Sequence, residues 1–458
     1  MTQEQIQQIV EGQREYFASG ATLDIKTRKK LLKALHASVH AHEKDIADAL
    51  YKDLGKGADE SYMCESGLVL SEITHLIKKI KKYAKPKRKR TPIAHYFSKS
   101  YELPSPRGNV LVMSPWNYPF LLSMDPLAEA VAAGNTVILK TSRYSPATAD
   151  IIAKIVGEVF DERHVAAISG GREVNDILTD SVFDYIFFTG GKTVGKIVYE
   201  KAAKNMTPVT LELGGKSPLI VDKTANIKLA ARRIVWGKLI NAGQTCVAPD
   251  YLWCDRSIKD KLVQAIIKEI EKQYPDALND DTYGKIITER HFERVTGLID
   301  KEKVVYGGAS NAETRKIQPT IMDNVTFADA VMGEEIFGPI LPVMTFDSLD
   351  EVIKKVNEMP SPLALYFFSS NKKAINRVMR VARFGGGCVN DVVIHLATSN
   401  MGFGGFGASG IGSYHGKKGF DTFSHVKSIV DKKTFADLPF RYRPYTKIKS
   451  GLVKKFLK

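Results

Sequence analysis

Cys246 is the residue whose neighbours most clearly favour covalent chemistry. It lies in the run Asn241–Tyr251, among small and polar residues, with a glycine and a glutamine just before it that let backbone and substrate approach closely. A thiolate is a strong nucleophile, and nearby backbone amides stabilise first the thiolate and later an oxyanion. An unreactive buried thiol is the alternative, because cysteine is among the most buried residue types. The rest of the chain decides between these interpretations.

The composition is typical of a globular protein with large cores. The 458 residues are 44% hydrophobic and 26% charged, which allows two or three domains. No run approaches the ~20 apolar residues of a membrane span, and the polar N-terminus has no apolar leader segment. The four cysteines are scattered and form no C-x-x-C pair, which favours a reducing compartment. We expect a cytoplasmic protein without a metal site.

The chain is strongly basic. Its formal net charge is +15 and its pI is near 9.3, which favours anionic partners: nucleic acid, anionic lipid or a phosphorylated cofactor. Basic residues concentrate in Lys85–Arg90 and in Arg441–Lys458. Charge alone does not choose among these partners, and solvated surface is the simpler interpretation of both runs.

Apolar periodicity predicts which elements position these residues. Residues 24–84 repeat leucine, valine and isoleucine at helical steps, and Tyr96–Leu103 has an extended character that closes at Pro104–Pro106. From Gly108 onward, strands alternate with helices, which predicts a parallel sheet covered on both faces. The predicted strands are Val110–Met113, Thr136–Leu139, His164–Ile168 and Tyr185–Phe188, and the helices Asp125–Ala133, Ala147–Val159 and Val194–Lys204.

The strand end and helix start in Phe187–Gly195 favour a dinucleotide cofactor, because the amides and dipole of such a helix suit a phosphate group. The run lacks the G-x-G-x-x-G spacing of ordinary Rossmann proteins, so a generic glycine turn is the alternative. Lys140 and Arg143 follow the predicted strand Thr136–Leu139. They therefore lie at the sheet edge where nucleotides bind.

Six motifs follow one another along almost the whole chain. They are Pro115–Pro119, Phe188–Gly190, Leu211–Lys216, Gly243–Cys246, Glu334–Pro339, and Tyr414–Gly416 with Phe420–His425. In this order they resemble the aldehyde dehydrogenase superfamily, and more narrowly its class 3 branch, which oxidises fatty and aromatic aldehydes. The resemblance implies an α/β fold of two Rossmann-like parallel-sheet domains plus a bridging β arm. It assigns residues 1–84 and 106–212 to NAD(P) binding, 213–424 to catalysis, and 85–105 and 425–458 to the arm and tail.

The resemblance also implies catalytic roles. Cys246 is the matching nucleophile, Asn117 the matching side-chain donor to the oxyanion, and Glu212 the matching general base. Taken alone, Asn117 is equally consistent with a cap on the turn between two prolines, and Glu212 with a strand-end carboxylate paired with Lys216.

Cofactor contacts are implied in the same way. Glu335 matches the family's ligand to the nicotinamide ribose and Phe337 its ring-packing neighbour. Lys140 matches the adenosine-ribose ligand, and Gly190, Gly191 and Val194 line the pyrophosphate and adenine region. Many relatives carry a glutamate where this chain has Arg143. A guanidinium pairs well with a phosphate, so we expect NADP to be accepted beside NAD and preferred, the alternative being an arginine that points into solvent.

The partners expected are a medium- or long-chain aliphatic or aromatic aldehyde and a second copy of the chain. Class 3 relatives are typically dimers, so residues 85–105 are expected to extend the partner's sheet; a mobile surface hairpin is the alternative. The tail 440–458 puts apolar residues on one helical face and lysines around it, which allows peripheral contact with an anionic membrane, a cover over the substrate entrance, or a disordered end.

A CoA-acylating dehydrogenase and a basic protein that binds nucleic acid or membranes are the rival functions. We expect no nucleic-acid binding, because basic residues are not interleaved with aromatic ones.

Overall fold

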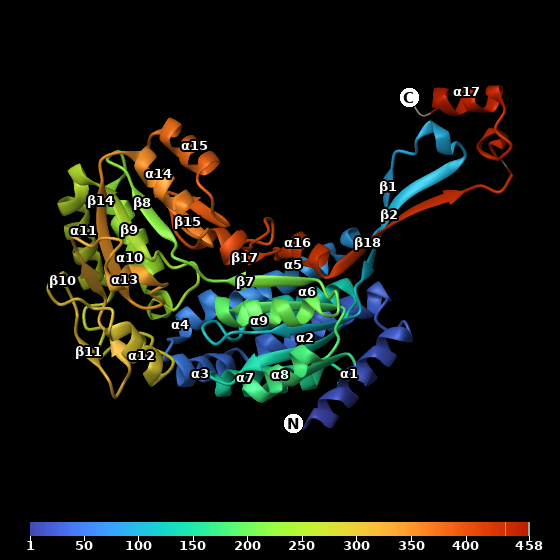
Figure 1. The fold of residues 1–458 in the computed structure, drawn as a ribbon. Helices are drawn as coiled ribbons and strands as arrows, with labels where there is room; N and C mark the ends of the chain where they lie inside the picture. The colour runs from blue at the N-terminus through green and yellow to red at the C-terminus, as the bar shows by residue number, and fades with distance from the viewer. Residues whose placement is uncertain (436, 457–458) are drawn as a thin grey trace.

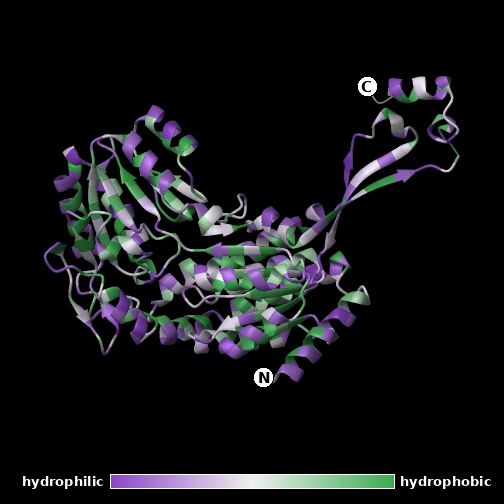
Figure 2. Ribbon diagram, in the orientation of Figure 1, coloured by the Kyte–Doolittle hydropathy of each residue, from purple (hydrophilic) through white to green (hydrophobic). Residues whose placement is uncertain are grey.

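The computed structural model describes residues 1–435 and 437–456, so positions 436, 457 and 458 of the expected tail lie outside the described residues. Figure 1 shows two α/β bodies side by side, with an arm that projects away from one of them. Apolar residues gather on the strands of both bodies, and hydrophilic residues on the outer helix faces (Figure 2). This is the layered α/β architecture that the alternation of strands and helices predicts.

The first body contains a six-stranded sheet in the order β17-β7-β6-β3-β4-β5. Its strands are β3 (Asn109–Met113), β4 (Thr136–Ser142), β5 (Val165–Gly170), β6 (Tyr185–Gly190), β7 (Val209–Leu213) and β17 (Gly410–Ile411). All neighbours are parallel except β17, which returns from late in the chain and pairs antiparallel with β7. Every residue of β3 and β4 is buried, as expected for strands covered on both faces.

Helices cover this sheet. They are α1 (Gln3–Ala18), α2 (Ile25–Ala41), α3 (Glu43–Leu54), α4 (Ala58–Ser61), α5 (Gly67–Tyr83), α6 (Leu121–Ala133), α7 (Pro146–Val159), α8 (Arg172–Asp180), α9 (Lys192–Ala203) and α16 (Gly416–Thr422). The helical periodicity over residues 24–84 is confirmed by α2, α3 and α5. A single π-helical turn, Tyr62–Ser66, joins α4 to α5. The short helix α16 packs on α5 and α6, so the last part of the chain returns to the first body.

The second body contains a seven-stranded sheet in the order β10-β13-β14-β9-β8-β15-β16. Its strands are β8 (Pro218–Val221), β9 (Tyr251–Asp255), β10 (Val304–Tyr306), β13 (Thr320–Met322), β14 (Ile340–Phe346), β15 (Ala364–Phe368) and β16 (Gly386–Val389). Only β10 runs antiparallel to its neighbour. The helices of this body are α10 (Ile227–Leu239), α11 (Lys259–Gln273), α12 (Glu289–Thr296), α13 (Ala330–Gly333), α14 (Leu349–Glu358) and α15 (Lys372–Val381), and a small hairpin is formed by β11 (Ser310–Asn311) and β12 (Lys316–Ile317).

The arm is a three-stranded antiparallel sheet. Its strands are β1 (Lys87–Lys89), β2 (Ser98–Pro106) and β18 (Ser424–Lys432), and helix α17 (Lys447–Phe456) lies beyond its tip in Figure 1. The predicted extended segment is confirmed from Ser98 onward, and β2 ends at Pro106, inside the predicted closing run Pro104–Pro106. Beyond Glu102 only β18 pairs with β2. The prolines therefore lack an N–H where no second strand needs one.

Candidate active site

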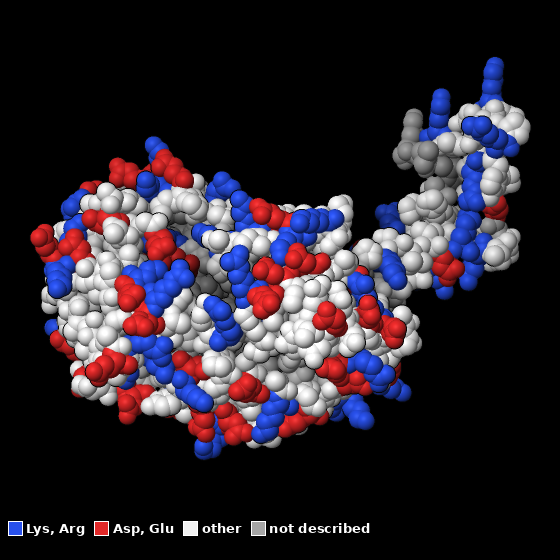
Figure 3. Space-filling view, turned by 60° about the horizontal axis from the view of Figure 1, so that its bottom comes forward, with Lys and Arg blue, Asp and Glu red and all other residues white. Residues whose placement is uncertain are grey.

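A cavity of about 980 Å³ contains Cys246. Its walls come from the carboxyl ends of the parallel strands β3, β6 and β7 and from loops of the second body, the place where nucleotides bind in such sheets. Figure 3 shows the hollow in the surface of the main body, with lysine and arginine side chains at its rim. Asn117, Glu212, Gly190, Gly191, Glu335 and Phe337 line this cavity together with Cys246.

The loop that carries Cys246 is held by unusual backbone angles and buried polar contacts. Asn241, Ala242 and Gly243 have φ angles of 52°, 50° and 75°, and a Cβ at Gly243 would lie 2.3 Å from the carbonyl oxygen of Gly338. Gln244 Nε2 donates to the Asn241 carbonyl at 3.1 Å, and Gln244 Oε1 accepts from the Ile287 amide at 3.0 Å. The close approach expected at the glycine before Cys246 is therefore between the backbone at Gly243 and the backbone at Gly338. Gln244 is fully buried and shapes the loop, so it does not make room for substrate.

The Cys246 thiol sits in a poorly hydrated place. Burial, together with the charges of Glu335 and Glu212, raises the pKa of the Cys246 thiol to about 12. The backbone amides of Cys246 and Val247 act in the opposite direction. In the protein alone the sulfur is thus a protonated thiol at neutral pH, and a base or a cationic ligand is needed to produce the nucleophile.

Asn117 is buried beside this loop. Its Nδ2 donates to the Gln244 carbonyl at 3.0 Å, and its own carbonyl accepts from Asn241 Nδ2 at 2.7 Å. Both bonds cross to a segment more than 120 residues away along the chain. The Asn117 side chain therefore contacts the loop that carries Cys246 and does not cap the turn between Pro115 and Pro119. Its second amide hydrogen is left for another acceptor.

Glu212 is an acid without a partner. It lies near the end of β7, it is 3% exposed, and neither carboxyl oxygen has a hydrogen-bond partner in the described chain. Burial raises its pKa well above the ordinary value of a glutamic acid. The alternative of an ion pair with Lys216 is wrong, because Lys216 Nζ bonds to Asp250 Oδ2 at 2.5 Å and to the carbonyl of Glu334 at 2.8 Å. A buried carboxyl without a partner is a candidate acid–base group.

The nicotinamide side of a dinucleotide fits the second wall of the cavity. The Glu335 carboxylate lies so close over Gly214 that a Cβ there would be 2.1 Å from Glu335 Oε2. Glu335 Oε1 is buried without a hydrogen-bond partner, which leaves an acceptor for a ribose hydroxyl. Burial, followed by the charge of Asp250, raises the pKa of Glu335 to about 8. The Phe337 ring packs edge-on against Trp116, at 5.4 Å between centroids.

The phosphate and adenosine candidates lie along the same sheet edge. Gly191 is the N-terminal cap of α9, and the space where its Cβ would be is open, so a phosphate group could approach the helix start. Lys140 is buried at the end of β4, where desolvation and then the charge of Arg143 lower its pKa to about 8. Arg143 is exposed and lies over Gly171, the N-terminal cap of α8. Lys140, Arg143 and Val194 lie beyond the residues that line the cavity.

The structure adds residues that no sequence motif singled out. His291, on α12, packs against Trp116 with the rings tilted by 41° and 5.2 Å between their centroids, and Arg290 and Arg294 from the same helix line the cavity. Thr189 also lines the cavity, and its hydroxyl oxygen is buried without a partner. Trp116 and Thr189 lie within the motifs Pro115–Pro119 and Phe188–Gly190. The sequence could not identify the α12 residues as part of the site, because α12 has the pattern of an ordinary amphipathic helix.

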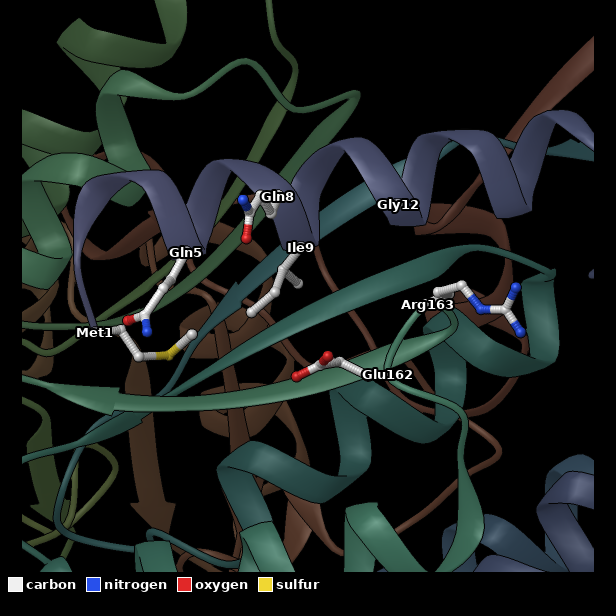
Figure 4. A pocket seen from close by; sticks show the side chains of 7 residues that line it. All are labelled: Met1, Gln5, Gln8, Ile9, Gly12, Glu162 and Arg163. Carbon is white, nitrogen blue, oxygen red and sulfur yellow. The ribbon is translucent and has the colours of Figure 1, made fainter.

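A second pocket lies far from this chemistry. It has a volume of about 340 Å³ and lies between α1 and the segment before β5, as Figure 4 shows. Its lining residues are Met1, Gln5, Gln8, Ile9, Gly12, Glu162 and Arg163. It shares no residue with the Cys246 cavity and contains no nucleophile, so the candidate active site is the larger cavity alone.

Comparisons with known proteins agree with this fold and cavity. Residues 1–429 match the model of the aldehyde dehydrogenase family. The chain therefore belongs to that family, and it is an NAD(P)-dependent enzyme that oxidises aldehydes. It is 46% identical to a 4,4'-diaponeurosporen-aldehyde dehydrogenase of Staphylococcus aureus (97% of each chain) and 43% identical to a dimeric, NADP-preferring aldehyde dehydrogenase of Canis lupus familiaris (96% of this chain, 98% of the other). A solved structure of the substrate-bound state of Staphylococcus aureus AldH superposes with a TM-score of 0.97 at 45% identity, over 99% of both chains.

Proposed function

We propose that this enzyme oxidises medium- or long-chain aliphatic or aromatic aldehydes to carboxylic acids, with Cys246 as nucleophile, Asn117 as oxyanion donor and Glu212 as general base. The observation that carries the proposal is the unpartnered, buried Glu212 carboxyl in the same cavity as the Cys246 thiol. Much of the cavity wall is apolar, which suits an aldehyde with a hydrophobic body. Its apolar members are Leu122, Trp116, Phe327, Met332, Met359 and Pro360.

The first half of the reaction is carbonyl capture. The thiol proton leaves to Glu212, directly or through a water, and the sulfur bonds to the carbonyl carbon. The carbonyl π electrons move to oxygen, which the Asn117 Nδ2 and the Cys246 amide stabilise as an oxyanion. One such donor contributes ~10²- to 10³-fold to the rate.

The second half is oxidation and hydrolysis. The carbon loses its hydrogen together with the C–H electron pair, and a thioester of Cys246 remains. A nicotinamide, when bound, would accept this pair, and Glu335 and Phe337 are the residues that would hold it. Glu212 releases the thiol proton to solvent and then removes a proton from water. The resulting hydroxide adds to the thioester carbon, the C–S bond breaks to release the acid, and the sulfur takes the proton back from Glu212.

An aldehyde panel tests the substrate class. Aldehydes of rising chain length and aromatic aldehydes are assayed for NAD(P)H production and for the acid formed. We expect kcat/KM to rise from two-carbon to medium-chain aldehydes as apolar contact in the cavity increases. A preference for the shortest aldehydes would refute the substrate class and leave the catalytic residues untouched.

For the cofactor, we propose that NADP is used beside NAD and preferred. The Arg143 guanidinium beside the start of α8 gives a 2′-phosphate both a cation and a helix N-terminus. The canine relative named above as NADP-preferring supports the same direction. Comparison of kcat/KM for the two cofactors tests this; a preference for NAD above about tenfold, or 1.4 kcal/mol, would refute it.

The acylating alternative, in which coenzyme A takes the thioester, is less well supported because Glu212 is placed to activate water. An assay with coenzyme A present decides between them. If coenzyme A leaves the yield of carboxylic acid unchanged, the result supports hydrolysis of the thioester. If acyl-CoA forms, the acylating function replaces the hydrolytic one.

We further propose that the enzyme is a homodimer whose arm, residues 85–105 and 425–458, joins two copies, while residues 1–84 and 106–212 bind the cofactor and 213–424 carry catalysis. The strand β18 occupies one edge of the arm sheet and pairs only with β2, so its outer edge is open for strand addition. Relatives named as dimeric support this proposal. Light scattering of the full chain and of a chain ending at residue 423 tests it: the shorter chain is expected to be a monomer.

A cytoplasmic location with peripheral membrane contact is also proposed. The four cysteines are free thiols, which suits a reducing compartment. No helix in the described part of the chain is long and apolar enough to span a bilayer. The arm end is rich in lysine and arginine (Figure 3), and Ile448 on α17 is 78% exposed. Cell fractionation, and flotation with anionic vesicles with and without residues 440–458, test these two statements.

A further inference from the structure

Three buried metal-ligand side chains meet on the first body, away from the cavity of Cys246. They are Glu72 on α5, Glu129 on α6 and His415, which directly precedes α16. One ligand atom from each lies within 4.8 Å of the other two. The three side chains are 3%, 0% and 6% exposed, and they come from segments that are far apart in the sequence.

The carboxylates of this cluster have no lysine or arginine partner among residues 1–435 and 437–456. Asp125 lies one turn before Glu129, and its Oδ2 is 3.6 Å from His415 Nδ1, a contact that is an ion pair only when the imidazole is protonated. Two oxygens, Glu129 Oε2 and Asp125 Oδ1, are buried without any hydrogen-bond partner. A buried carboxylate is costly unless a cation or a proton compensates it, so the group needs one.

The chain leaves room for such a cation. A cavity of about 30 Å³ is lined by Glu72, Asp125 and His415, which is enough space for an ion or a water. At Gly419 a Cβ would lie 2.0 Å from the Glu129 side-chain carboxyl carbon, so only glycine accommodates that carboxylate. His415 has a φ of 76°, and the Glu129 and Glu72 carboxylates accept from the amides of His415 and Gly416 at 2.7 and 2.9 Å. The strained backbone is thus fixed by the same two acids.

We propose that Glu72, Glu129 and His415 form a binding site for a divalent transition-metal cation, with Asp125 beside the imidazole. Two carboxylates and an imidazole are a ligand set suited to Mn²⁺ or Zn²⁺, and less so to Ca²⁺ or Mg²⁺, which prefer oxygen alone. Donor atoms bound to a tetrahedral ion at about 2.1 Å are roughly 3.4 Å apart, so the three donor atoms, which lie within 4.8 Å of one another, must move closer together on binding. The ion would tie α5 and α6 to the segment that returns through β17 to the first body. This role is structural and does not depend on aldehyde oxidation.

Binding of Mn²⁺ to the full-length enzyme tests the site. The protein is treated with a chelator, dialysed without nucleotide, and titrated with Mn²⁺ while electron paramagnetic resonance follows the free ion. We expect about one bound Mn²⁺ per chain and a rise in melting temperature with Mn²⁺. Glu129→Gln is expected to weaken binding by more than tenfold. Asp421→Asn, which neutralises a half-buried acid on nearby α16 that pairs with Lys417 outside the cluster, is the matched control and is expected to bind as the parent does.

Three outcomes would overturn the proposal: no stoichiometric binding, equal binding by Glu129→Gln, or binding that disappears in Cys246→Ser and so belongs to the catalytic thiol. The first means that protons neutralise the carboxylates. If Glu129→Gln does not fold, Asp125→Asn and Glu72→Gln provide the same comparison, with circular dichroism as the check on folding. Because turnover is not the readout, failure of this site and failure of the proposed aldehyde oxidation are distinguishable.

Discussion

Replacing Glu212 by glutamine is the sharpest test of the catalytic assignment. The substitution keeps the shape of the side chain and removes the ability to accept a proton. Because neither Glu212 oxygen has a hydrogen-bond partner, no structural contact is lost, and we expect the melting temperature to stay the same or rise. A general base contributes ~10²- to 10⁴-fold, so kcat should fall by that factor, or by about 3 to 5 kcal/mol.

The assay separates the two halves of the reaction. If Glu212 is needed mainly to activate water, the Glu212→Gln enzyme still forms the thioester, and a stopped-flow trace shows a burst of one NAD(P)H per active site before slow turnover. The acyl group is then found on the Cys246 peptide by mass spectrometry. Glu335→Gln lines the same cavity and is the matched control. It is expected to raise the KM for the cofactor without accumulating acyl-enzyme.

Two results would contradict this reasoning. A kcat within threefold of the parent would show that another group activates water. A large loss of kcat with neither burst nor acyl-enzyme would show that Glu212 serves only the deprotonation of the thiol, and the hydrolytic role would have to be reassigned.

Four further predictions follow from the same geometry. Asn117→Ala is expected to lower kcat by ~10²- to 10³-fold with a small change in KM, measured by steady-state kinetics; an unchanged kcat would remove Asn117 from the oxyanion site. Arg143→Glu is expected to move the ratio of kcat/KM for NADP over NAD by at least tenfold toward NAD, and no movement would mean that Arg143 points into solvent. Because burial holds the Cys246 pKa at about 12, alkylation of Cys246 by iodoacetamide without cofactor should accelerate about tenfold per pH unit from pH 7 to 9, and a plateau below pH 8 would contradict that environment. Gly243→Ala would place a Cβ 2.3 Å from the Gly338 carbonyl, so activity and melting temperature should both fall; a fully active variant would show that this loop relaxes.

The sequence predicts the architecture well because buried strands and helix faces need apolar residues in a recognisable pattern. The run Val110–Met113 is apolar throughout and Thr136–Leu139 is apolar after its first residue, and the structure buries both in β3 and β4. The pairing of Gly410–Ile411 with β7 could not be predicted, since two residues carry no period and the contact spans about 200 residues of chain. The end of β2 within Pro104–Pro106 was predicted, but its pairing with β18 was not, since the two strands are more than 300 residues apart along the chain.

The motifs predicted which residues surround the cavity. Those residues are held in position by hydrogen bonds to residues outside the motifs. Glu60 Oε1 accepts from the Asn241 amide at 2.7 Å, and Asn241 Nδ2 in turn bonds to the Asn117 carbonyl at 2.7 Å. Glu65, within the π-helical turn Tyr62–Ser66, accepts from the Phe120 amide at 2.8 Å. In the sequence, both acids look like the solvated face of a helix. Their role appears only once packing removes water from them.

The buried acids of this protein therefore fall into two physical groups. Glu65 pairs with Lys56 and receives two backbone amides, so its negative charge is satisfied and it fixes the loop that carries Asn117. Glu212 has no such partners, and its environment favours the protonated form. A carboxylate with hydrogen-bond and ion-pair partners is suited to positioning other groups, whereas a buried carboxyl without partners has no bond to lose when it exchanges a proton and is suited to catalysis. Glu129 lies between these two groups. Its Oε1 accepts a hydrogen bond from the His415 amide and its Oε2 has no partner, as expected of a carboxylate that binds a cation through the second oxygen.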